Sequence, residues 1–356
     1  MIKVGVVGLG KMGMLHLKNC CFINDAKVVA ACDASKSKSQ KARGMGIKYV
    51  YNDYKDMLKS ADVDALIIAL PNFMHLESIC AAAEAGKDVF VEKPLAPSVD
   101  ECEKIARVVE KYGVKLMVGH NYRFFDSVEK VKNEFEIGIV GDVELATFEL
   151  ALNGPFAPAI EPTPVPEWYF TKEGIGMGCL DSGYHLIDLF QWFFGEAEVL
   201  YAHLGYRYHL PYEDSAIIVL RSKNESAKGV LNVGWFSKAI FPKFDFRMIL
   251  HGTAGFMSTD QYAPKNLYVH AAKEGMKNVL RRLFGRTISP LTYTYYYASY
   301  AKELKHFFNC IKTDSEPLVT VDEARKNVEV IERIYQEYGK VIPYESAEKL
   351  HKIYTQ

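Results

Sequence analysis

IKVGVVGLGKMG, residues 2–13, is the stretch that decides the fold of the first part of the chain. Residues 2–7 form a short apolar run typical of a buried strand, and glycines follow in the pattern G-x-G-x-x-G before a helical stretch. In this setting the first glycine permits a tight turn, the second lets the backbone approach a pyrophosphate, and the third lets helix and strand pack closely. Free N–H groups at a helix start bind the anion. The stretch predicts a dinucleotide site made by Gly8, Gly10, Lys11, Met12 and Gly13.

A carboxylate stands where such a site needs one. A second apolar strand, residues 28–32, ends at Asp33, which lies 20 residues after Gly13. A carboxylate in this place accepts the ribose hydroxyls of NAD and repels the 2′-phosphate of NADP. Three residues that follow closely could instead hold that phosphate: Ser35, Lys36 and Lys38. We therefore expect NAD as the favoured cofactor, with NADP as the alternative.

Strands and helices continue to alternate up to residue 118. Apolar runs predict strands at 48–50, 65–69, 88–91 and 116–118, and helical patterns lie at 35–44, 53–60, 74–85 and 99–112. This alternation predicts an α/β fold with a Rossmann doubly wound parallel sheet and helices on both faces. Ligands of such sheets bind just beyond the carboxyl ends of the strands. Residues that directly follow a strand are therefore the candidates for cofactor and substrate contact.

Two strand ends carry such candidates. The strand at 65–69 is followed, where the cofactor would pass, by Leu70, Pro71, Asn72 and His75. Asn72 could reach the nicotinamide half, whereas His75 has capping or packing of the next helix as its alternative role. The strand at 88–91 is followed by Glu92, Lys93 and Pro94. Alone, these three residues fit a surface turn, but their position at a strand end predicts that they face cofactor and substrate.

GIGMGCLDSGYHLID, residues 174–188, is the most informative stretch of the second half. Its alternating glycines let the backbone approach a ligand or another segment closely. Asp181 and His185 are four residues apart, so they share one face if a helix begins near Asp181. The carboxylate can then orient the imidazole, which is suited to take a hydroxyl proton near neutral pH. The alternative is an N-capping aspartate and a packed histidine.

Apolar runs between residues 143 and 258, separated by turn-rich segments, predict a sheet of antiparallel strands. The proline-rich stretch 153–166 excludes a regular element, and a long loop beside a site is commonly functional. Asn153 opens this loop. Trp168 follows it, as part of either a hydrophobic plug or a wall for a sugar ring.

Residues 271–286 carry five basic side chains and one acidic one, Glu274. The plainer interpretation is a solvated helix face, with the tyrosine-rich run 293–300 packed in a sheet. A sharper hypothesis is that the segment binds an anionic substrate, because arginine can clamp a phosphate with two hydrogen bonds. A helix on a membrane surface is a third option.

Length and composition limit the classes of protein. At 356 residues, we expect two domains, with the boundary between 122 and 123. The formal net charge of −1 gives no reason to expect nucleic acid or a membrane as partner. The start of the chain shows no signal peptide, so we expect a cytoplasmic protein. Seven cysteines without C-x-x-C spacing predict neither a disulfide framework nor a metal site.

The sequence resembles the glucose-fructose oxidoreductase / inositol dehydrogenase (Gfo/Idh/MocA) family. The motifs that carry the resemblance are GVVGLGKMG at 5–13, ALPN at 69–72, FVEKP at 90–94, GHNYRF at 119–124, GIGMGCLDSGYHLID at 174–188 and HGTAGFM at 251–257, with residues 317–335 extending it. The resemblance implies a dinucleotide-binding Rossmann domain at 1–122. It also implies an α/β domain at 123–356 for substrate binding and oligomerisation. This domain would have a large, open, mainly antiparallel sheet that builds a homo-dimer or homo-tetramer, and its C-terminal helix would pack back on the first domain.

The resemblance also implies an activity, an NAD(P)-dependent oxidoreductase acting on a secondary alcohol of a sugar, cyclitol or nucleotide-sugar derivative. His185 would take the hydroxyl proton, Lys93 would hydrogen-bond the same oxygen, and Asp181 would position one of them or the substrate. Glu92 and Pro94 would fix the loop under the nicotinamide, with a cis Lys93–Pro94 bond. The candidates for substrate contact are Tyr122, Arg123, Asn153 and Trp168.

Two other functions fit the same residues. Some relatives in the family hold NAD tightly and hydrolyse glycosides through a transient 3-keto sugar, without net oxidation. The second alternative is a cofactor-binding sensor that does not turn over. The presence of Lys93, Asp181 and His185 together argues against the sensor, because a sensor has no need of all three.

Overall fold

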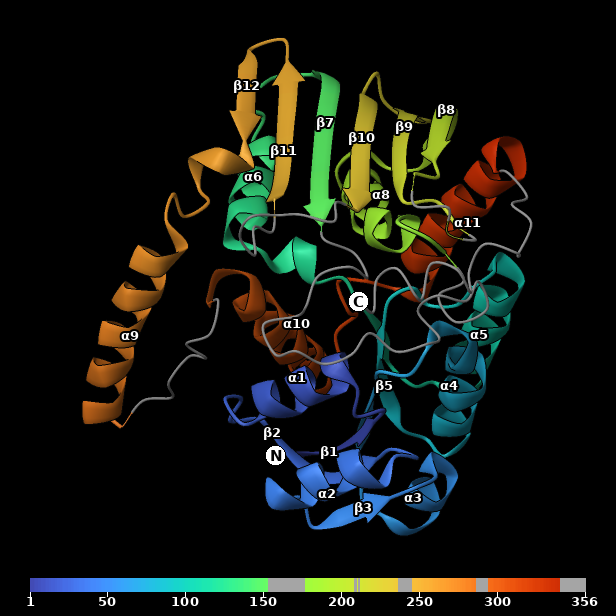
Figure 1. Cartoon of the computed structure of the whole chain (residues 1–356), viewed down its shortest axis with the longest axis vertical. Helices are drawn as coiled ribbons and strands as arrows, with labels where there is room; N and C mark the ends of the chain where they lie inside the picture. The colour runs from blue at the N-terminus through green and yellow to red at the C-terminus, as the bar shows by residue number, and fades with distance from the viewer. Residues whose placement is uncertain (153–176, 208–209, 211, 236–244, 286–293, 340–356) are drawn as a thin grey trace. The chain divides into compact units, whose positions relative to one another are not determined.

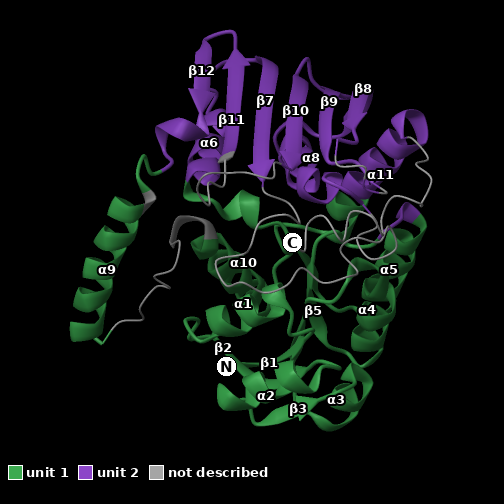
Figure 2. Ribbon diagram, in the orientation of Figure 1, with its two compact units in different colours: residues 1–96, 100–126, 264–325 green, residues 97–99, 127–263, 326–356 purple. Residues whose placement is uncertain are grey.

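The computed structural model describes residues 1–152, 177–207, 210, 212–235, 245–285 and 294–339. The chain forms two compact units, shown in green and purple in Figure 2. Unit 1 comprises residues 1–96, 100–126 and 264–325, and unit 2 comprises 97–99, 127–263 and 326–356. The units are therefore interleaved along the sequence, because a late segment returns to the N-terminal unit.

Unit 1 is built on a six-stranded sheet in the order β3-β2-β1-β4-β5-β6 (Figure 1). Every strand pair in it is parallel. The strands are β1 (Ile2–Val7), β2 (Ala26–Cys32), β3 (Tyr49–Tyr51), β4 (Ala65–Ile68), β5 (Asp88–Glu92) and β6 (Leu116–Gly119). The connecting helices are α1 (Lys11–Cys20), α2 (Lys36–Gly44), α3 (Tyr54–Ser60), α4 (His75–Glu84) and α5 (Val99–Tyr112). The strand order and direction are those of a Rossmann fold, as the sequence predicts.

Short 3₁₀ helices follow two of these strands, η1 (Asn72–Met74) and η2 (Asn121–Phe124). Two longer helices from the second half of the chain also belong to unit 1, α9 (Leu267–Leu283) and α10 (Thr294–Thr313). Helix α10 packs against α1 and η2. The expectation that residues 293–300 pack in a sheet is wrong, since residues 294–300 form the first turns of α10.

Unit 2 contains a second six-stranded sheet, in the order β12-β11-β7-β10-β9-β8. Its strands are β7 (Val143–Leu152), β8 (Ala197–Gly205), β9 (Ser215–Ser222), β10 (Lys228–Trp235), β11 (Asp245–Gly252) and β12 (Gly255–Ser258). The central pair β7–β10 is parallel, and the other four pairs are antiparallel. The sheet is therefore mixed but mainly antiparallel, which confirms the expected fold class.

One face of this second sheet is covered by α8 (Leu180–Phe194), as Figure 1 shows. Phe190 of α8 lies so close to β10 that a Cβ added at Gly229 would come within 2.6 Å of its ring. Phe190 also meets Phe148 of β7 edge to face. Three further elements complete the described chain: α6 (Asp126–Glu136), η5 (Thr259–Gln261) and α11 (Val321–Tyr338).

Within the described ranges, no helix combines the length and apolar character needed to cross a bilayer. Among the described residues, there is no cluster of three or more His, Cys, Asp or Glu side chains that could hold a metal ion. All seven cysteines are free thiols.

Candidate active site

The glycine loop after β1 is packed closely on two sides and open on a third. Gly8 has a φ of +86°, and a Cβ added there would lie 2.5 Å from the carbonyl oxygen of Ala69. A Cβ at Gly13 would overlap the carbonyl oxygen of Gly8. A Cβ at Gly10, in contrast, would meet no atom within 4 Å. The loop therefore needs glycine at 8 and 13 for internal packing, whereas Gly10 leaves room for a ligand to approach the backbone.

Helix α1 begins directly after Gly10 and has no side-chain cap. The first N–H groups of a helix have no partner within the helix, and together with the helix dipole they favour an anion. The backbone of this turn is therefore suited to hold a pyrophosphate. This geometry fits the dinucleotide that the sequence predicts.

Asp33 is fixed next to the glycine loop by the backbone. Its carboxylate accepts hydrogen bonds from the N–H of Leu9 at 2.7 Å and the N–H of Ser35 at 2.8 Å. Lys38, a candidate for holding a 2′-phosphate, lies 3.4 Å from the same carboxylate. The carboxylate thus stands at the end of β2 with lone pairs left for the ribose hydroxyls of NAD.

His75 joins two loops at the carboxyl ends of the strands. Its Nδ1 lies 3.0 Å from the carbonyl oxygen of Pro94, and its Nε2 lies 3.0 Å from that of Leu70. Burial of the ring lowers the pKa of His75. Because both ring nitrogens face protein carbonyls, the structure favours the packing role named as the alternative for His75. Through these contacts, it positions Leu70 and Pro94 beside the predicted cofactor path.

A second histidine, which sequence reasoning missed, supports the loop after β5. His16 of α1 is fully buried, and its Nε2 lies 2.5 Å from a carboxylate oxygen of Glu92. Burial alone would raise the pKa of Glu92, but the hydrogen bond and charge of His16, together with the charge of Lys93, bring this pKa below its ordinary value. His16 lies three residues after Gly13 on the inward side of α1, and that periodicity was the available signal.

Lys93 follows Glu92 at the carboxyl end of β5 and is half-buried. The Lys93–Pro94 bond is cis, as expected. Since β1, β4, β5 and β6 are parallel neighbours, the segments that leave their carboxyl ends emerge at one edge of the sheet. The structure therefore brings the glycine loop, Asn72 and Lys93 to one edge within unit 1.

Two predicted substrate contacts in η2 are buried within the same unit. Tyr122 is stacked on Phe125, with ring centroids 4.7 Å apart. The Arg123 side chain is 1% exposed and donates hydrogen bonds to the carbonyl oxygen of Leu318 at 3.0 Å and to Glu323 at 3.1 Å. In this structure, Arg123 holds the start of α11 rather than facing solvent. The other two substrate candidates, Asn153 and Trp168, lie outside the described residues.

Asp181 and His185 lie on the first turns of α8, in unit 2, as predicted from their spacing. Asp181 is half-buried and His185 is buried, with 8% of its surface exposed. Asp188, one turn further along, is fully buried and accepts a hydrogen bond from Asn327 at 2.9 Å. This contact is consistent with a structural role for Asp188, so Asp181 and His185 remain the predicted catalytic pair on α8.

The start of α8 is held by Glu213, which no local pattern predicts. Its carboxylate accepts hydrogen bonds from the N–H of Leu180 at 2.9 Å and from the hydroxyl of Tyr335 at 3.0 Å. The Tyr335 hydroxyl in turn accepts from the N–H of Gly178 at 3.1 Å. A Cβ added at Gly178 would overlap the carbonyl oxygen of Glu213, so this close approach needs glycine. Burial raises the pKa of Glu213 to about 7, against the lowering effect of these hydrogen bonds.

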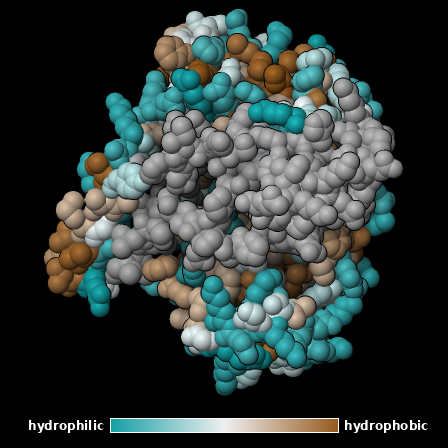
Figure 3. All heavy atoms as spheres, in the orientation of Figure 1, coloured by the Kyte–Doolittle hydropathy of each residue, from teal (hydrophilic) through white to brown (hydrophobic). Residues whose placement is uncertain are grey.

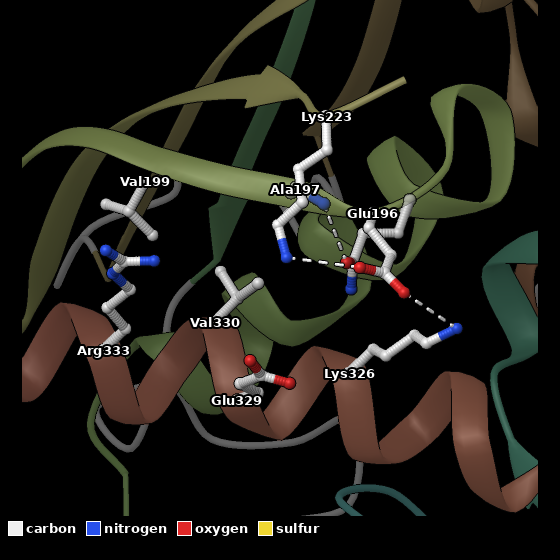
Figure 4. Close-up of a pocket in the computed structure, with 9 residues that line it drawn as sticks. Glu196, Ala197, Val199, Lys223, Lys326, Glu329, Val330 and Arg333 are labelled. Atoms are coloured by element: carbon white, nitrogen blue, oxygen red, sulfur yellow. Dashed lines mark hydrogen bonds and ion pairs between the residues drawn. The ribbon is translucent and has the colours of Figure 1, made fainter. Parts of the chain in front are cut away.

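A shallow pocket in unit 2 is a separate feature (Figure 4). Its lining side chains come from the end of α8, from β8, from Lys223 just after β9 and from α11, and Glu196, between α8 and β8, lies at its centre. Glu196 pairs with Lys223 and with Lys326, each at 3.2 Å, and these hydrogen bonds lower the pKa of Glu196. The charges are satisfied by one another, and none of the predicted site residues lines this pocket. We regard it as a surface ion-pair network.

Comparison with known proteins agrees with this geometry. Residues 2–120 match the model of an oxidoreductase family with an NAD-binding Rossmann fold, and residues 134–341 match the C-terminal α/β domain of the same family. An uncharacterised oxidoreductase of Bacillus subtilis, YrbE, is 29% identical over 98% of each chain. The scyllo-inositol 2-dehydrogenase (NAD⁺) of Bacillus subtilis is 26% identical over 92% of each chain.

The fold is also found in a solved structure. The scyllo-inositol dehydrogenase of Lactobacillus casei, determined with bound NAD(H) and scyllo-inositol, superimposes with a TM-score of 0.78. The two sequences are 23% identical, and the match covers 95% of this chain and 97% of the other. With both family domains matched over most of the sequence, the chain belongs to the Gfo/Idh/MocA family of oxidoreductases, whose N-terminal domain is an NAD-binding Rossmann fold.

Proposed function

We propose that this protein is an NAD-dependent dehydrogenase that oxidises a secondary alcohol of a cyclitol, sugar or nucleotide sugar. The observation that carries the proposal is the turn Glu92–Lys93–Pro94 at the carboxyl end of β5, on the same sheet edge as the glycine loop. A cation at that edge lies where cofactor and substrate meet in doubly wound folds. The relatives named as inositol dehydrogenases support a polyol as the substrate class.

Residues of unit 1 would hold the cofactor. The turn at Gly10 and the first N–H groups of α1 would bind the pyrophosphate, and Asp33 would accept the ribose hydroxyls. NAD bound there would supply the acceptor for the hydride of the carbinol carbon. His75 and the His16–Glu92 pair act indirectly, by fixing the loops that follow β4 and β5.

Three side chains would accept the substrate's hydroxyl proton and stabilise the negative charge that develops on its oxygen. His185 would accept the hydroxyl proton at a ring nitrogen as general base. Lys93 would donate a hydrogen bond to the same oxygen and stabilise the negative charge that develops there. Asp181, four residues before His185 on α8, would orient the imidazole or a substrate hydroxyl.

Assembly would use the open face of the second sheet. By strand register, four exposed apolar side chains lie on the face opposite α8: Leu145, Tyr201, Ile217 and Phe256. Large apolar side chains exposed on one open face of a sheet are typical of an interaction site. We therefore propose a homo-dimer or homo-tetramer built through this face.

The substrate class is tested by supplying the protein with NAD and a panel of inositols, aldoses, phosphorylated sugars and nucleotide sugars. We expect NADH to accumulate in stoichiometric amounts with at least one polyol or sugar. A glycosidase with a transient keto intermediate would instead release product with no net NADH. A protein that binds NADH but converts no member of the panel would contradict the proposal.

A further inference from the structure

Helix α9 presents its apolar side to solvent. Seven large apolar residues in and just after the helix are at least half exposed: Tyr268, Val269, Met276, Val279, Leu280, Leu283 and Phe284. Figure 3 shows the corresponding brown surface at the left edge of the molecule, over the position of α9 in Figure 1. The inward side is polar, with Asn278 buried at 6% exposure. This is the reverse of an ordinary surface helix, which turns its apolar stripe to the core.

The polar side is held together by its own contacts. Arg281 donates hydrogen bonds to Asn278 at 2.9 Å and to Glu274 at 3.2 Å, and Glu274 also pairs with Lys277. Glu274 is the only acid among the basic residues of this helix, so its charge is already used within the chain. Two of the basic residues that suggested a phosphate site are therefore engaged in fixing the helix face.

Five exposed residues of α9 have the spacing of a seam, that is, a line of side chains along which one helix packs against another. Val269, Ala272, Met276, Val279 and Leu283 follow one another at intervals of three, four, three and four residues. This is the a/d repeat by which one helix packs into another. Ala272 is also exposed, and as a small residue it lets a second helix approach closely. A small residue contributes little to insertion into a lipid surface, so the seam favours a helix as the partner.

The apolar area is sufficient for a stable contact. Seven such side chains, each exposing roughly 100 Å² or about half of a large buried side chain, offer about 700 Å² per copy. A standard interface buries about 800 Å² per partner, whereas the largest apolar patch of a monomer is about 300–600 Å². A second copy of this chain carries the same seam, and a two-fold pair places the seam centre, Met276, beside its own symmetry mate.

We propose that α9 is a self-association element, which pairs with α9 of a second copy through the seam from Val269 to Leu283. This contact is separate from the sheet face of unit 2 and does not depend on the proposed activity. Together, the two surfaces would allow a dimer formed through one of them to associate further through the other.

The first test is the mass of the full-length protein by light scattering and sedimentation. We expect Met276→Glu with Val279→Glu to halve the mass of the wild-type assembly. The matched control is Lys59→Glu on α3, which changes the charge by the same amount at an exposed site and should leave the mass unchanged. A wild-type monomer, or a double variant with wild-type mass, would overturn the proposal.

The second test locates the contact. Met276→Cys should be joined into a covalent dimer by a short bis-maleimide linker, whereas the wild type and Lys59→Cys should not. Unchanged cross-linking among all three would contradict pairing through α9. A further experiment measures binding of the wild type and the double variant to vesicles of phosphatidylcholine with phosphatidylserine. Binding to these vesicles that the double variant abolishes, together with an unchanged mass, would assign the stripe to a lipid surface instead.

Discussion

Replacing Glu213 by glutamine should remove a pH dependence of stability that the fold builds into unit 2. The carboxyl group is fully buried, and this burial raises its pKa from 4.5 to about 7. Glutamine has nearly the same shape, and its carbonyl oxygen can still accept the N–H of Leu180. The substitution therefore removes the titration while it keeps the main contact at the start of α8.

The pKa shift of Glu213 determines the sign and the size of the change in the free energy of unfolding with pH. Below about pH 4.5, Glu213 is protonated in both the native and unfolded states and makes no difference to stability. Between 4.5 and about 7, the unfolded chain releases the proton while the native state keeps it, so the free energy of unfolding falls as pH rises. At 1.36 kcal/mol per pKa unit, the total loss is about 3 kcal/mol.

Urea unfolding followed by tryptophan fluorescence measures this difference, since Trp192 and Trp235 both lie in unit 2. The free energy of unfolding of Glu213→Gln minus that of the wild type should rise by about 3 kcal/mol from about pH 5 to about pH 8. Tyr335→Phe is the control, because it removes a hydrogen bond, at a cost of about 1–3 kcal/mol, but keeps the titrating carboxyl. If the free energies of unfolding of Glu213→Gln and the wild type changed in parallel with pH, the raised pKa of Glu213 would be refuted.

Three further outcomes are expected. Gly10→Ala should fold like the wild type, because the added Cβ meets open space, but its affinity for NAD, measured by calorimetry, should be lower. Gly13→Ala should instead lower the melting temperature, because its Cβ would overlap the carbonyl oxygen of Gly8. Asp33→Ala should shift the ratio of kcat/KM values from NAD toward NADP by tenfold or more, about 1.4 kcal/mol, and an unchanged ratio would contradict the ribose contact. His16→Leu should lower the free energy of unfolding by about 3–5 kcal/mol, because it leaves the buried Glu92 without its partner, and a chemical denaturation curve like that of the wild type would argue against an ion pair there.

Much of unit 1 could be predicted because its signals are local. The alternation of apolar runs and helical patterns placed β1 to β6 in order, and α5 has the bounds that its helical pattern indicates. The same local logic put Glu92 and Lys93 at a strand end, since a proline follows a short apolar run. Periodicity also identified α8 as the helix that carries Asp181 and His185.

The contacts that hold the site depend on residues far apart in sequence. Glu213 meets Tyr335 across 122 positions, and Arg123 meets Glu323 across 200. No window of sequence contains both partners, so neither the ion pair of Arg123 nor the contacts of Glu213 could be predicted from local patterns. The start of α10 was missed for a related reason, because a run of tyrosines has the composition of a strand, and packing against α1 and η2 decides the outcome.

The most direct test of the central claim is the single-turnover rate of NADH formation in Lys93→Met and His185→Asn, with the substrate that the panel identifies. The account predicts that both substitutions slow this step by about 10²–10⁴-fold, the usual contribution of a general acid or base. NAD affinity and the free energy of unfolding should stay near their wild-type values. Wild-type rates of NADH formation in both variants would contradict the account.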